Sequence, residues 1–304
     1  MLHLSLPRMI VIPGPSSLGL GWRIAERCGV DPQPVEHRVF PDGESYIKFT
    51  KSVSGEKVVI VQTTAPNPDT RLMQLLLMAR TAKDFGAKDI VAVVPYLAYA
   101  RQDKRFTELE ALSLDVIFSL LECSGVTDLV TVNIHNEAST RDVERKHRVR
   151  FHNLSAVPLL AEYLKKEGFD KAYSLSPDKG AIYIAEAASK VLDGGYNFFE
   201  KTRDRKTGEI TMAVKDLNIS GRRAVVFDDM ISSGGTMAKA VEALMAQGAE
   251  RVAAACTHVL YMPGTEEKIR KAGADPIIAT NTIETSFSRV SVAGLVADKL
   301  KELE

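Results

Sequence analysis

The sequence predicts an α/β fold made of two similar halves, each a mainly parallel sheet flanked by helices. Three observations support this prediction. Short apolar runs alternate with segments of helical periodicity along the whole chain, as in parallel sheets covered on both faces. The 304 residues are enough for two medium-sized domains. The segment Gly86–Val93 resembles the segment Gly248–Ala255, and each follows a predicted helix and begins a predicted strand.

Strands are expected where apolar and β-branched residues follow one another, a pattern typical of strands with both faces covered. In chain order they are Met9–Ile12, Val58–Gln62, Ile90–Val94, Leu129–Ile134, Ala172–Leu175, Ala224–Phe227 and Val252–Val259. Helices are expected where apolar residues recur every three or four positions. They are Leu18–Cys28, Thr70–Phe85, Glu110–Cys123, Ala156–Glu167, Ala181–Val191, Thr236–Gln247 and Val292–Glu302.

The polar stretch Asn136–His152 is the best place for a boundary between the halves. We therefore expect an N-terminal domain over residues 1–150 and a C-terminal domain over residues 151–291. The helix in residues 292–304 is expected to pack back on the N-terminal domain.

The composition is that of an ordinary globular protein and excludes several classes. Lys plus Arg equals Asp plus Glu, 39 each, so no overall basic field favours nucleic acid or an anionic membrane. The three cysteines fit neither a disulfide framework nor a zinc site. No apolar run approaches the roughly 18 residues of a membrane span, and the amino end lacks a signal pattern. We therefore expect a cytoplasmic protein without nucleic-acid or membrane partners.

The segment Val226–Thr236 carries the clearest functional pattern. Two acids, Asp228 and Asp229, follow a predicted buried strand, and Ser232, Ser233, Gly234, Gly235 and Thr236 precede a predicted helix. Such a loop lies at the carboxyl end of a strand, where open α/β sheets bind ligands. Its small residues and free N–H groups can wrap a phosphate at the positive end of the helix. The acids would repel that phosphate, so they suit sugar hydroxyls or a metal ion. An acidic turn with an N-cap residue is the alternative.

Three further loops follow predicted strands or separate β-like runs. Phe40–Glu44 is an acidic turn, which turn chemistry alone explains. Tyr96–Arg105 concentrates positive charge, and its Arg101 and Gln102 can hold phosphate oxygens or a base edge, although a solvated basic loop explains it equally well. His135 ends another predicted strand, where a structural role competes with ligand binding.

Two more loops lie in the second half. Ser176–Gly180 is a tight turn between a strand and a helix, whose amides can cradle a second phosphate and whose Asp178 can bind Mg²⁺. Lys201–Gly208 is basic and polar, and by itself it indicates an exposed, mobile hairpin tip.

Together these loops resemble, in order and over nearly the whole chain, the phosphoribosyl pyrophosphate (PRPP) synthetase family, and most of all its archaeal branch. The Val226–Thr236 segment is similar to the ribose 5-phosphate loop that this family shares with type I phosphoribosyltransferases. Phe40–Glu44, Tyr99–Asp103, Ser176–Gly180 and the pair Lys201 and Arg203 single out the synthetase. The resemblance implies two type I phosphoribosyltransferase-like domains, with ATP on the N-terminal side and ribose 5-phosphate on the C-terminal side.

The resemblance also implies a reaction and a role for each loop. ATP would give its β,γ-diphosphate to the C1 hydroxyl of ribose 5-phosphate. Mg²⁺ would be the cofactor, and the enzyme would be a homo-oligomer, at least a dimer. The implied contacts are Arg101, Gln102 and Asp103 to ATP, with Phe40, Asp42 and Glu44 from a neighbouring subunit; Asp228, Asp229 and Ser232–Thr236 to ribose 5-phosphate; Asp178, Lys179 and Gly180 to the diphosphate; His135 and Asp178 to magnesium; and Lys201 and Arg203 to the transferring group.

Two departures and two alternatives remain. Asn133 stands where many relatives carry an acid, and Asn136–Val143 replaces a glutamine-rich segment, so regulation by phosphate or ADP and a hexamer are not carried over.

A PRPP-consuming phosphoribosyltransferase would share Asp228–Thr236 but would not need an adenine clamp. A non-catalytic synthetase-associated subunit is expected to have lost loop residues that are intact here.

Overall fold

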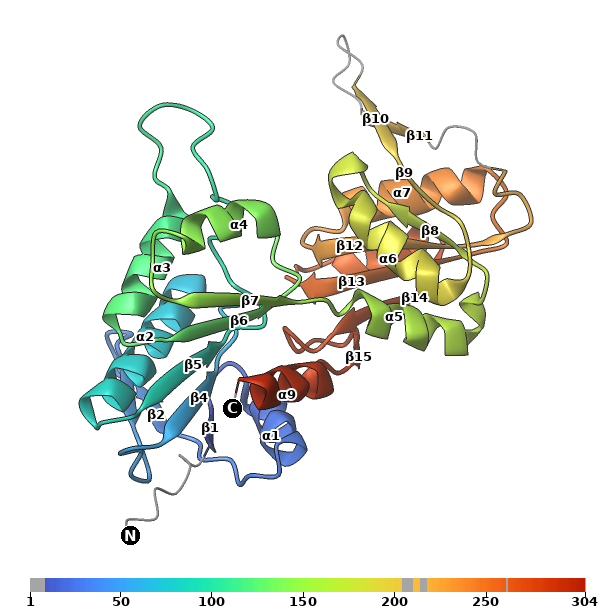
Figure 1. Ribbon diagram of the computed structural model, residues 1–304. Helices are drawn as coiled ribbons and strands as arrows, with labels where there is room; N and C mark the ends of the chain where they lie inside the picture. Colours follow the sequence, from blue (N-terminus) through green and yellow to red (C-terminus); the bar gives the residue numbers. More distant parts are fainter. Residues whose placement is uncertain (1–8, 204–209, 214–217, 261, 304) are drawn as a thin grey trace. The chain divides into compact units, whose positions relative to one another are not determined.

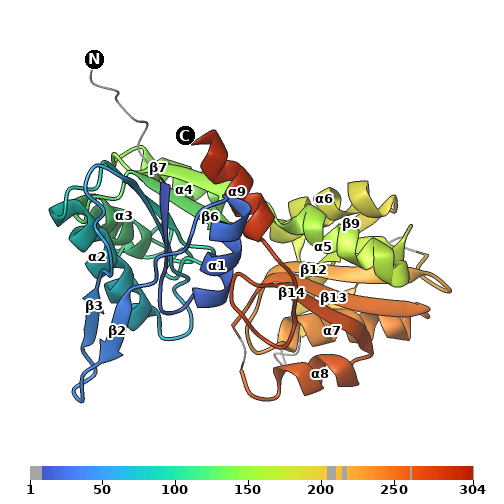
Figure 2. The same ribbon diagram turned by 90° about the horizontal axis from the view of Figure 1, so that it is seen from below.

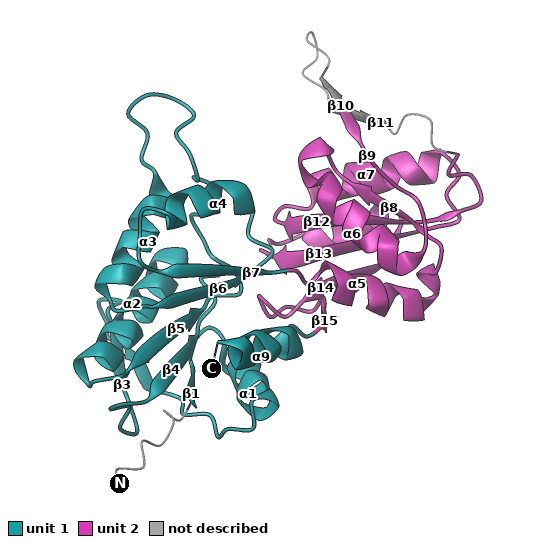
Figure 3. Ribbon diagram, viewed as in Figure 1, with its two compact units in different colours: residues 1–154, 291–304 teal, residues 155–290 magenta. Residues whose placement is uncertain are grey.

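The computed structural model describes residues 9–203, 210–213, 218–260 and 262–303. The chain divides into two compact units, Met1–Leu154 with Ser291–Glu304, and Ser155–Val290 (Figure 3). In both units, parallel strands alternate with helices (Figure 1). No helix in the described ranges is long and apolar enough to cross a membrane.

Unit 1 is built on a five-stranded parallel sheet in the order β1-β4-β5-β6-β7. The strands are β1 (Met9–Pro13), β4 (Lys57–Val61), β5 (Asp89–Val93), β6 (Asp128–Val132) and β7 (Arg150–Leu154). The helices are α1 (Leu18–Arg27), α2 (Pro68–Asp84), α3 (Ser113–Cys123), α4 (Glu137–Glu144) and α9 (Ala293–Glu302). Alternate strand residues such as Ile10, Val58 and Ile60 pack with α2 and α3. The C-terminal α9 lies beside α1 on the other face (Figure 2).

An antiparallel hairpin extends from unit 1 beside α2 (Figure 2). It consists of β2 (Glu36–Val39) and β3 (Ser45–Lys48). The turn between them is Phe40–Glu44, in which the N–H of Phe40 donates to the carbonyl of Glu44 at 2.8 Å.

Unit 2 is built on a six-stranded parallel sheet in the order β15-β14-β13-β12-β8-β9. The strands are β8 (Tyr173–Ser176), β9 (Tyr196–Phe198), β12 (Arg223–Ile231), β13 (Arg251–Val259), β14 (Ala274–Thr280) and β15 (Ser288–Val290). The helices are α5 (Val157–Leu164), α6 (Ile182–Leu192), α7 (Gly235–Ala246) and α8 (Thr265–Lys271), with a π turn at Lys165–Phe169 and a 3₁₀ turn at Lys179–Ala181. A hairpin of β10 (Glu200–Arg203) and β11 (Ile210–Ala213) follows β9.

Both faces of the unit 2 sheet are covered, because successive residues of β12 point to opposite sides. Ala224 and Val226 pack in the core formed with α7, and Val225 and Phe227 pack in the core formed with α5 and α6. The continuous apolar run in the sequence has this physical cause.

The polar stretch Asn136–His152, where a boundary was expected, lies just before the division between the units at Leu154 and Ser155. It holds α4 and the first residues of β7, and both belong to unit 1. The polarity has a local reason: Asn136 caps α4 by accepting from the N–H of Ser139, and Arg141 forms ion pairs with Glu137 and Glu144 at 3.1 Å each. Because capping and ion pairs stabilise this helix, it needs few apolar residues, and its sequence shows only a weak apolar periodicity.

The structure corrects the expectation that Asp228 and Asp229 lie in a loop. The strand β12 continues to Ile231, so both acids belong to its last residues. Its pairing with β13 continues through Ile231 opposite Val259, which holds the acids in extended backbone. The pairing with β13 thus outweighs the low strand propensity of Asp.

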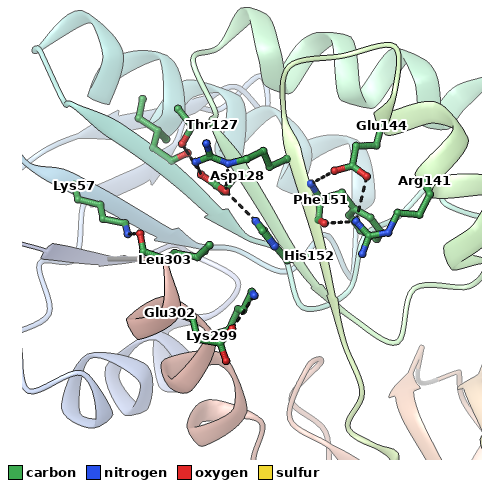
Figure 4. A network of polar contacts seen from close by, with 12 residues as sticks. Lys57, Thr127, Asp128, Arg141, Glu144, Phe151, His152, Lys299, Glu302 and Leu303 are labelled. Atoms are coloured by element: carbon green, nitrogen blue, oxygen red, sulfur yellow. Dashed lines mark hydrogen bonds and ion pairs between the residues drawn. The ribbon is translucent and has the colours of Figure 1, made fainter.

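An ionic network centred on the buried Asp128 joins the first residues of β6 and β7 (Figure 4). The Asp128 carboxylate accepts from Arg150 Nε at 2.8 Å, from Thr127 Oγ1 at 2.9 Å and from His152 Nε2 at 2.9 Å. Nearby, Lys57 Nζ donates to the carbonyl of Leu303, which ties the C-terminal segment to β4. The network is structural, and it lies at the opposite ends of the strands from the predicted binding loops.

Candidate active site

The loop between β12 and α7 has the geometry of an anion-binding turn. Gly234 adopts φ +74°, and a Cβ there would lie 3.1 Å from side-chain atoms of Thr265 and Ile269. Only glycine fits without strain, both for the backbone and for the space. The helix begins at Gly235, so the N–H groups of its first turn lie next to Ser232–Thr236.

Two residues of α8, which the sequence analysis missed, hold this loop from behind. Thr265 Oγ1 donates to the carbonyl of Ser232 at 3.0 Å, and Lys268 Nζ donates to the carbonyl of Ser233 at 2.9 Å. In a trans peptide the C=O and the following N–H point in opposite directions. Because the two carbonyls point toward α8, the N–H groups of Ser233 and Gly234 point away from it. No sequence signal marks this role, because α8 is only 7 residues long and Ile269 is its one apolar residue.

The acids at the end of β12 lie close together. The N–H of Asp229 donates to Asp228 Oδ1 at 2.9 Å. Burial raises the pKa of Asp228 well above its ordinary value, and the negative charges of Asp229 and Asp178 raise it further. A cation or a set of hydroxyl donors next to this cluster would relieve that repulsion.

The Asp178–Gly180 turn lies at the same edge of the unit 2 sheet. Because β8 pairs in parallel with β12, with Leu175 opposite Val226, the carboxyl ends of the two strands are neighbours. Asp178 caps the 3₁₀ turn by accepting from the N–H of Gly180 at 3.0 Å, and Lys179 and Gly180 are exposed. The structure therefore brings together the residues predicted for ribose 5-phosphate and those predicted for the diphosphate.

The carboxyl ends of β13 and β14 add buried polar groups that the sequence analysis did not single out. His258 lies in register with Met230 of β12 and forms a 2.8 Å hydrogen bond between its Nδ1 and Thr282 Oγ1. Thr282 Oγ1 and Thr280 Oγ1 both lie within 2.9 Å of the carbonyl of Thr257. In the sequence, the only sign of these groups is that the polar residues Thr257 and His258 interrupt the apolar run Val252–Val259.

In unit 1, Arg101, Gln102 and Asp103 lie in the loop between β5 and α3. Arg101 is exposed, Asp103 is buried, and Gln102 Nε2 approaches Glu110 Oε2 at 3.4 Å. The Glu110 carboxylate folds the loop by accepting from the N–H groups of Phe106 and Thr107, which lowers its pKa. The loop is therefore an ordered turn that presents a basic side chain.

Phe40, Asp42 and Glu44 form the exposed tip of the β2–β3 hairpin. Arg38 lies 5.1 Å from the ring centroid of Phe40 and 4.4 Å from that of Tyr46. Asp42 Oδ1 accepts from the N–H of Glu44 at 3.2 Å. An aromatic ring held at an exposed tip is available to stack on a base.

The metal prediction joins residues of different units. His135 is exposed beyond β6 in unit 1, whereas Asp178 belongs to unit 2. Among the described residues, no group of three or more His, Cys, Asp or Glu side chains could hold a metal ion. Both ligands stay predictions.

Lys201 and Arg203 lie in β10, paired with Met212 and Ile210 of β11. The tip of the predicted basic loop, residues 204–209, lies outside the described residues. The expectation of a mobile loop over the reacting group therefore stays a prediction.

Comparison with known proteins places these loops in one family. Residues 9–125 match the family model of the N-terminal domain of ribose phosphate pyrophosphokinase, and residues 171–288 match that of the phosphoribosyl transferase domain. The chain is 35% identical over 285 residues to the ribose-phosphate pyrophosphokinase of the archaeon Sulfurisphaera tokodaii, which covers 93% of this chain and 96% of the relative. Its identity to the enzyme of the archaeon Methanothermobacter thermautotrophicus is 39% over 269 residues, covering 88% and 92%.

A solved structure leads to the same family. The phosphoribosylpyrophosphate synthetase from Mycobacterium smegmatis matches with a TM-score of 0.86 at 27% identity, covering 97% of this chain and 98% of the other. The fold of two phosphoribosyltransferase-like domains and the archaeal relationship expected from the sequence are thereby confirmed. The chain belongs to the ribose-phosphate pyrophosphokinase family.

Proposed function

We propose that the chain transfers the β,γ-diphosphate of ATP to the C1 hydroxyl of ribose 5-phosphate, yielding PRPP and AMP. The observation that carries the proposal is the end of β12, where two acids precede a Gly-containing turn at the start of α7. Membership of the ribose-phosphate pyrophosphokinase family supports this reaction.

The unit 2 loops bind ribose 5-phosphate in this proposal. The N–H groups of Ser232–Thr236 hold the 5-phosphate, helped by the positive end of α7. Asp228 and Asp229 accept hydrogen bonds from the ribose hydroxyls, and the Asp178–Gly180 turn holds the diphosphate. Fixing the C1 hydroxyl in line with ATP is the main catalytic task, because this type of transfer depends on positioning and charge neutralisation.

The unit 1 loops bind ATP. Arg101, Gln102 and Asp103 contact the nucleotide, and Phe40, Asp42 and Glu44 of a second copy of the chain complete its adenine site. The protein therefore acts as a homo-oligomer, at least a dimer. Lys201 and Arg203 neutralise the charge that moves to the leaving AMP.

Magnesium fits the residues at hand. Asp178 would supply a carboxylate oxygen and His135 an imidazole nitrogen. Burial and then the charges of Asp229 and Asp178 raise the pKa of Asp228, and a divalent cation near these acids would offset that repulsion. Mg²⁺ is commonly bound by one or two carboxylates together with substrate phosphates. When bound, it screens the triphosphate.

One assay tests the proposal. The purified protein is incubated with ATP, Mg²⁺ and ribose 5-phosphate, and AMP and PRPP are followed by chromatography. Equimolar AMP and PRPP are expected. Consumption of added PRPP in the presence of a nucleobase would instead indicate a phosphoribosyltransferase. The absence of product under any condition would indicate a non-catalytic subunit.

A further inference from the structure

The side chain of Gln74 on α2 lies at the centre of a hydrogen-bond network that ends on the β2–β3 hairpin. Gln74 is completely buried. Its Oε1 accepts from Gln62 Nε2 and from Arg71 Nη1, each at 3.1 Å. Its Nε2 lies 3.0 Å from Ser45 Oγ and 3.1 Å from His37 Nε2, both on the hairpin.

The network fixes which way the Gln74 amide points. Gln62 is itself oriented, because its Oε1 accepts from the N–H of Ser16 at 3.1 Å and its Nε2 donates to the carbonyl of Arg71 at 3.2 Å. Gln62 Nε2 and the Arg71 guanidinium can only donate. A flipped Gln74 amide would place its NH₂ against both donors, so Gln74 presents its NH₂ to the hairpin.

This orientation decides the state of His37. A nitrogen that receives an N–H bond must be unprotonated, so Nε2 is the acceptor and the ring is neutral. Partial burial and then the positive charge of Arg71 lower the pKa of His37, which agrees with a neutral ring. The nearby hairpin charges Glu36 and Lys48 pair with each other at 3.0 Å.

The hairpin carries the exposed aromatic tip of the proposed adenine site. It packs beside α2 (Figure 2), and its partly buried Ile47 packs against the unit 1 core. β2 is exposed along its length, so its position depends strongly on these contacts with α2. A rotation at Ser45 and His37 would displace Phe40, which lies three residues from His37.

We propose that Gln74 is a positioning residue for ATP binding, which holds the β2–β3 hairpin so that Phe40 reaches the adenine. This inference rests on the proposed function for the role of Phe40. The network itself is a property of the fold and can be measured without activity.

The test compares Gln74→Leu, Gln74→Glu and Met73→Leu, the last an exposed neighbour on the same helix. Loss of hydrogen bonds worth about 1 kcal/mol each predicts that Gln74→Leu raises the KM for ATP roughly 5-fold or more. Its kcat and its KM for ribose 5-phosphate are expected to stay within about 2-fold. Gln74→Glu is the rescue variant, because a carboxylate accepts from Gln62 and Arg71 and also from Ser45 and His37. It and Met73→Leu should keep a near-native KM.

The pH dependence gives a readout that a general loss of packing would not give. As the pH falls below the ordinary histidine pKa of about 6.5 and His37 becomes protonated, its ring opposes the Gln74 NH₂, so the wild-type KM for ATP should rise. In Gln74→Glu, protonated His37 faces a carboxylate and that rise should be smaller. Comparing both proteins at each pH removes the effect of ATP protonation.

Hydrogen exchange separates this inference from the proposed function. The amides of Glu36–Lys48 should exchange roughly 5-fold faster or more in Gln74→Leu than in Met73→Leu, whether or not either protein makes PRPP. If Gln74→Leu does not fold, Ser45→Ala removes one contact from the hairpin side and should give a smaller change of the same kind. Unchanged exchange and KM for ATP in the folded variants, or an equal loss in kcat and both KM values, would overturn the proposal.

Discussion

The backbone N–H of Asp229 donates to the carboxylate of Asp228 at 2.9 Å, near the end of the strand β12 and directly before the loop that leads into α7. Burial raises the pKa of Asp228, and the charges of Asp229 and Asp178 raise it further. Burying these two adjacent acids therefore destabilises the folded protein, and such a cluster is typical of a functional site.

Replacing Asp229 by Asn should weaken ribose 5-phosphate binding and stabilise the fold. Loss of a charged hydrogen-bond acceptor, worth about 1.5–3 kcal/mol, predicts a rise of roughly 10–100-fold in the KM for ribose 5-phosphate. Steady-state kinetics of Asp229→Asn, with the exposed Asp298→Asn as control, measure this. A folded Asp229→Asn enzyme with native ribose 5-phosphate kinetics would contradict the assignment.

The stability effect has a definite sign. The folded pKa of Asp228 is raised above the unfolded value of about 3.9, so ionising Asp228 destabilises the fold as the pH rises above that value. Removing the charge of Asp229 lowers the folded pKa and reduces this cost at neutral pH. The Tm of Asp229→Asn at neutral pH should therefore lie above that of the wild type. A lower Tm for Asp229→Asn at neutral pH would show that the acid pair stabilises the fold.

The hydroxyl of Thr265 should affect ribose 5-phosphate binding although it lies behind the loop. Thr265→Val keeps the shape but removes the bond to the carbonyl of Ser232, so the peptide that presents the N–H of Ser233 is no longer held. The lost hydrogen bond that orients this peptide is worth about 1 kcal/mol, which predicts a roughly 5-fold higher KM for ribose 5-phosphate. Thr265→Ser retains the hydroxyl and is the matched control. Equal kinetics for the Val and Ser variants would rule out the hydrogen bond as the cause.

Most of the fold could be predicted because the central strands of both parallel sheets, such as β4, β6 and β13, are buried on both faces and form apolar runs in the sequence. The acids at the end of β12 were predicted as functional, but their place in the strand was not, since strand pairing with β13 outweighs the propensity of Asp. The polar helix α4 escaped prediction because capping and ion pairs stabilise it rather than an apolar face. Thr265 and Lys268 act on backbone carbonyls, which any sequence supplies, so no motif marks them.

Acid sensitivity should centre on Asp128. Burial alone would raise its pKa, but hydrogen bonds from His152, Arg150 and Thr127 hold the pKa well below its usual range (Figure 4). A depressed folded pKa gives stability that is present above the unfolded value of about 3.9 and is lost as the pH falls below it. Asp128→Asn should cost about 1–3 kcal/mol at neutral pH, because it leaves the buried donors poorly satisfied.

Denaturant unfolding of wild type and Asp128→Asn between about pH 7 and pH 3 measures this effect. The difference between the two proteins should shrink toward low pH, because the Asp128 carboxylate of the unfolded wild type binds a proton below about pH 3.9, which favours unfolding. A difference that stays constant with pH would mean that packing, not charge, is responsible.

Lys201 and Arg203 should act mainly on the rate. If their cationic side chains neutralise the transferring group in the transition state, Lys201→Ala and Arg203→Ala should each lower kcat by roughly 10²–10³-fold. The KM for ATP should change far less, because ground-state binding does not use these contacts. Both residues lie in β10, paired with β11 opposite Met212 and Ile210, so their backbone is held whatever the side chain.

The matched control is Lys190→Ala, an exposed lysine of α6 that pairs with Glu186 at 3.0 Å. All three variants should melt within a few degrees of the wild type, since charged surface residues usually contribute within about 0.5 kcal/mol. Steady-state kinetics and melting curves decide between two readings of the hairpin. A near-native kcat in Lys201→Ala and Arg203→Ala would mean that the β10–β11 hairpin has no catalytic role. A large decrease in Tm would show that these side chains stabilise the fold. A large loss of kcat at native Tm, absent from Lys190→Ala, would assign the two cations to the reaction.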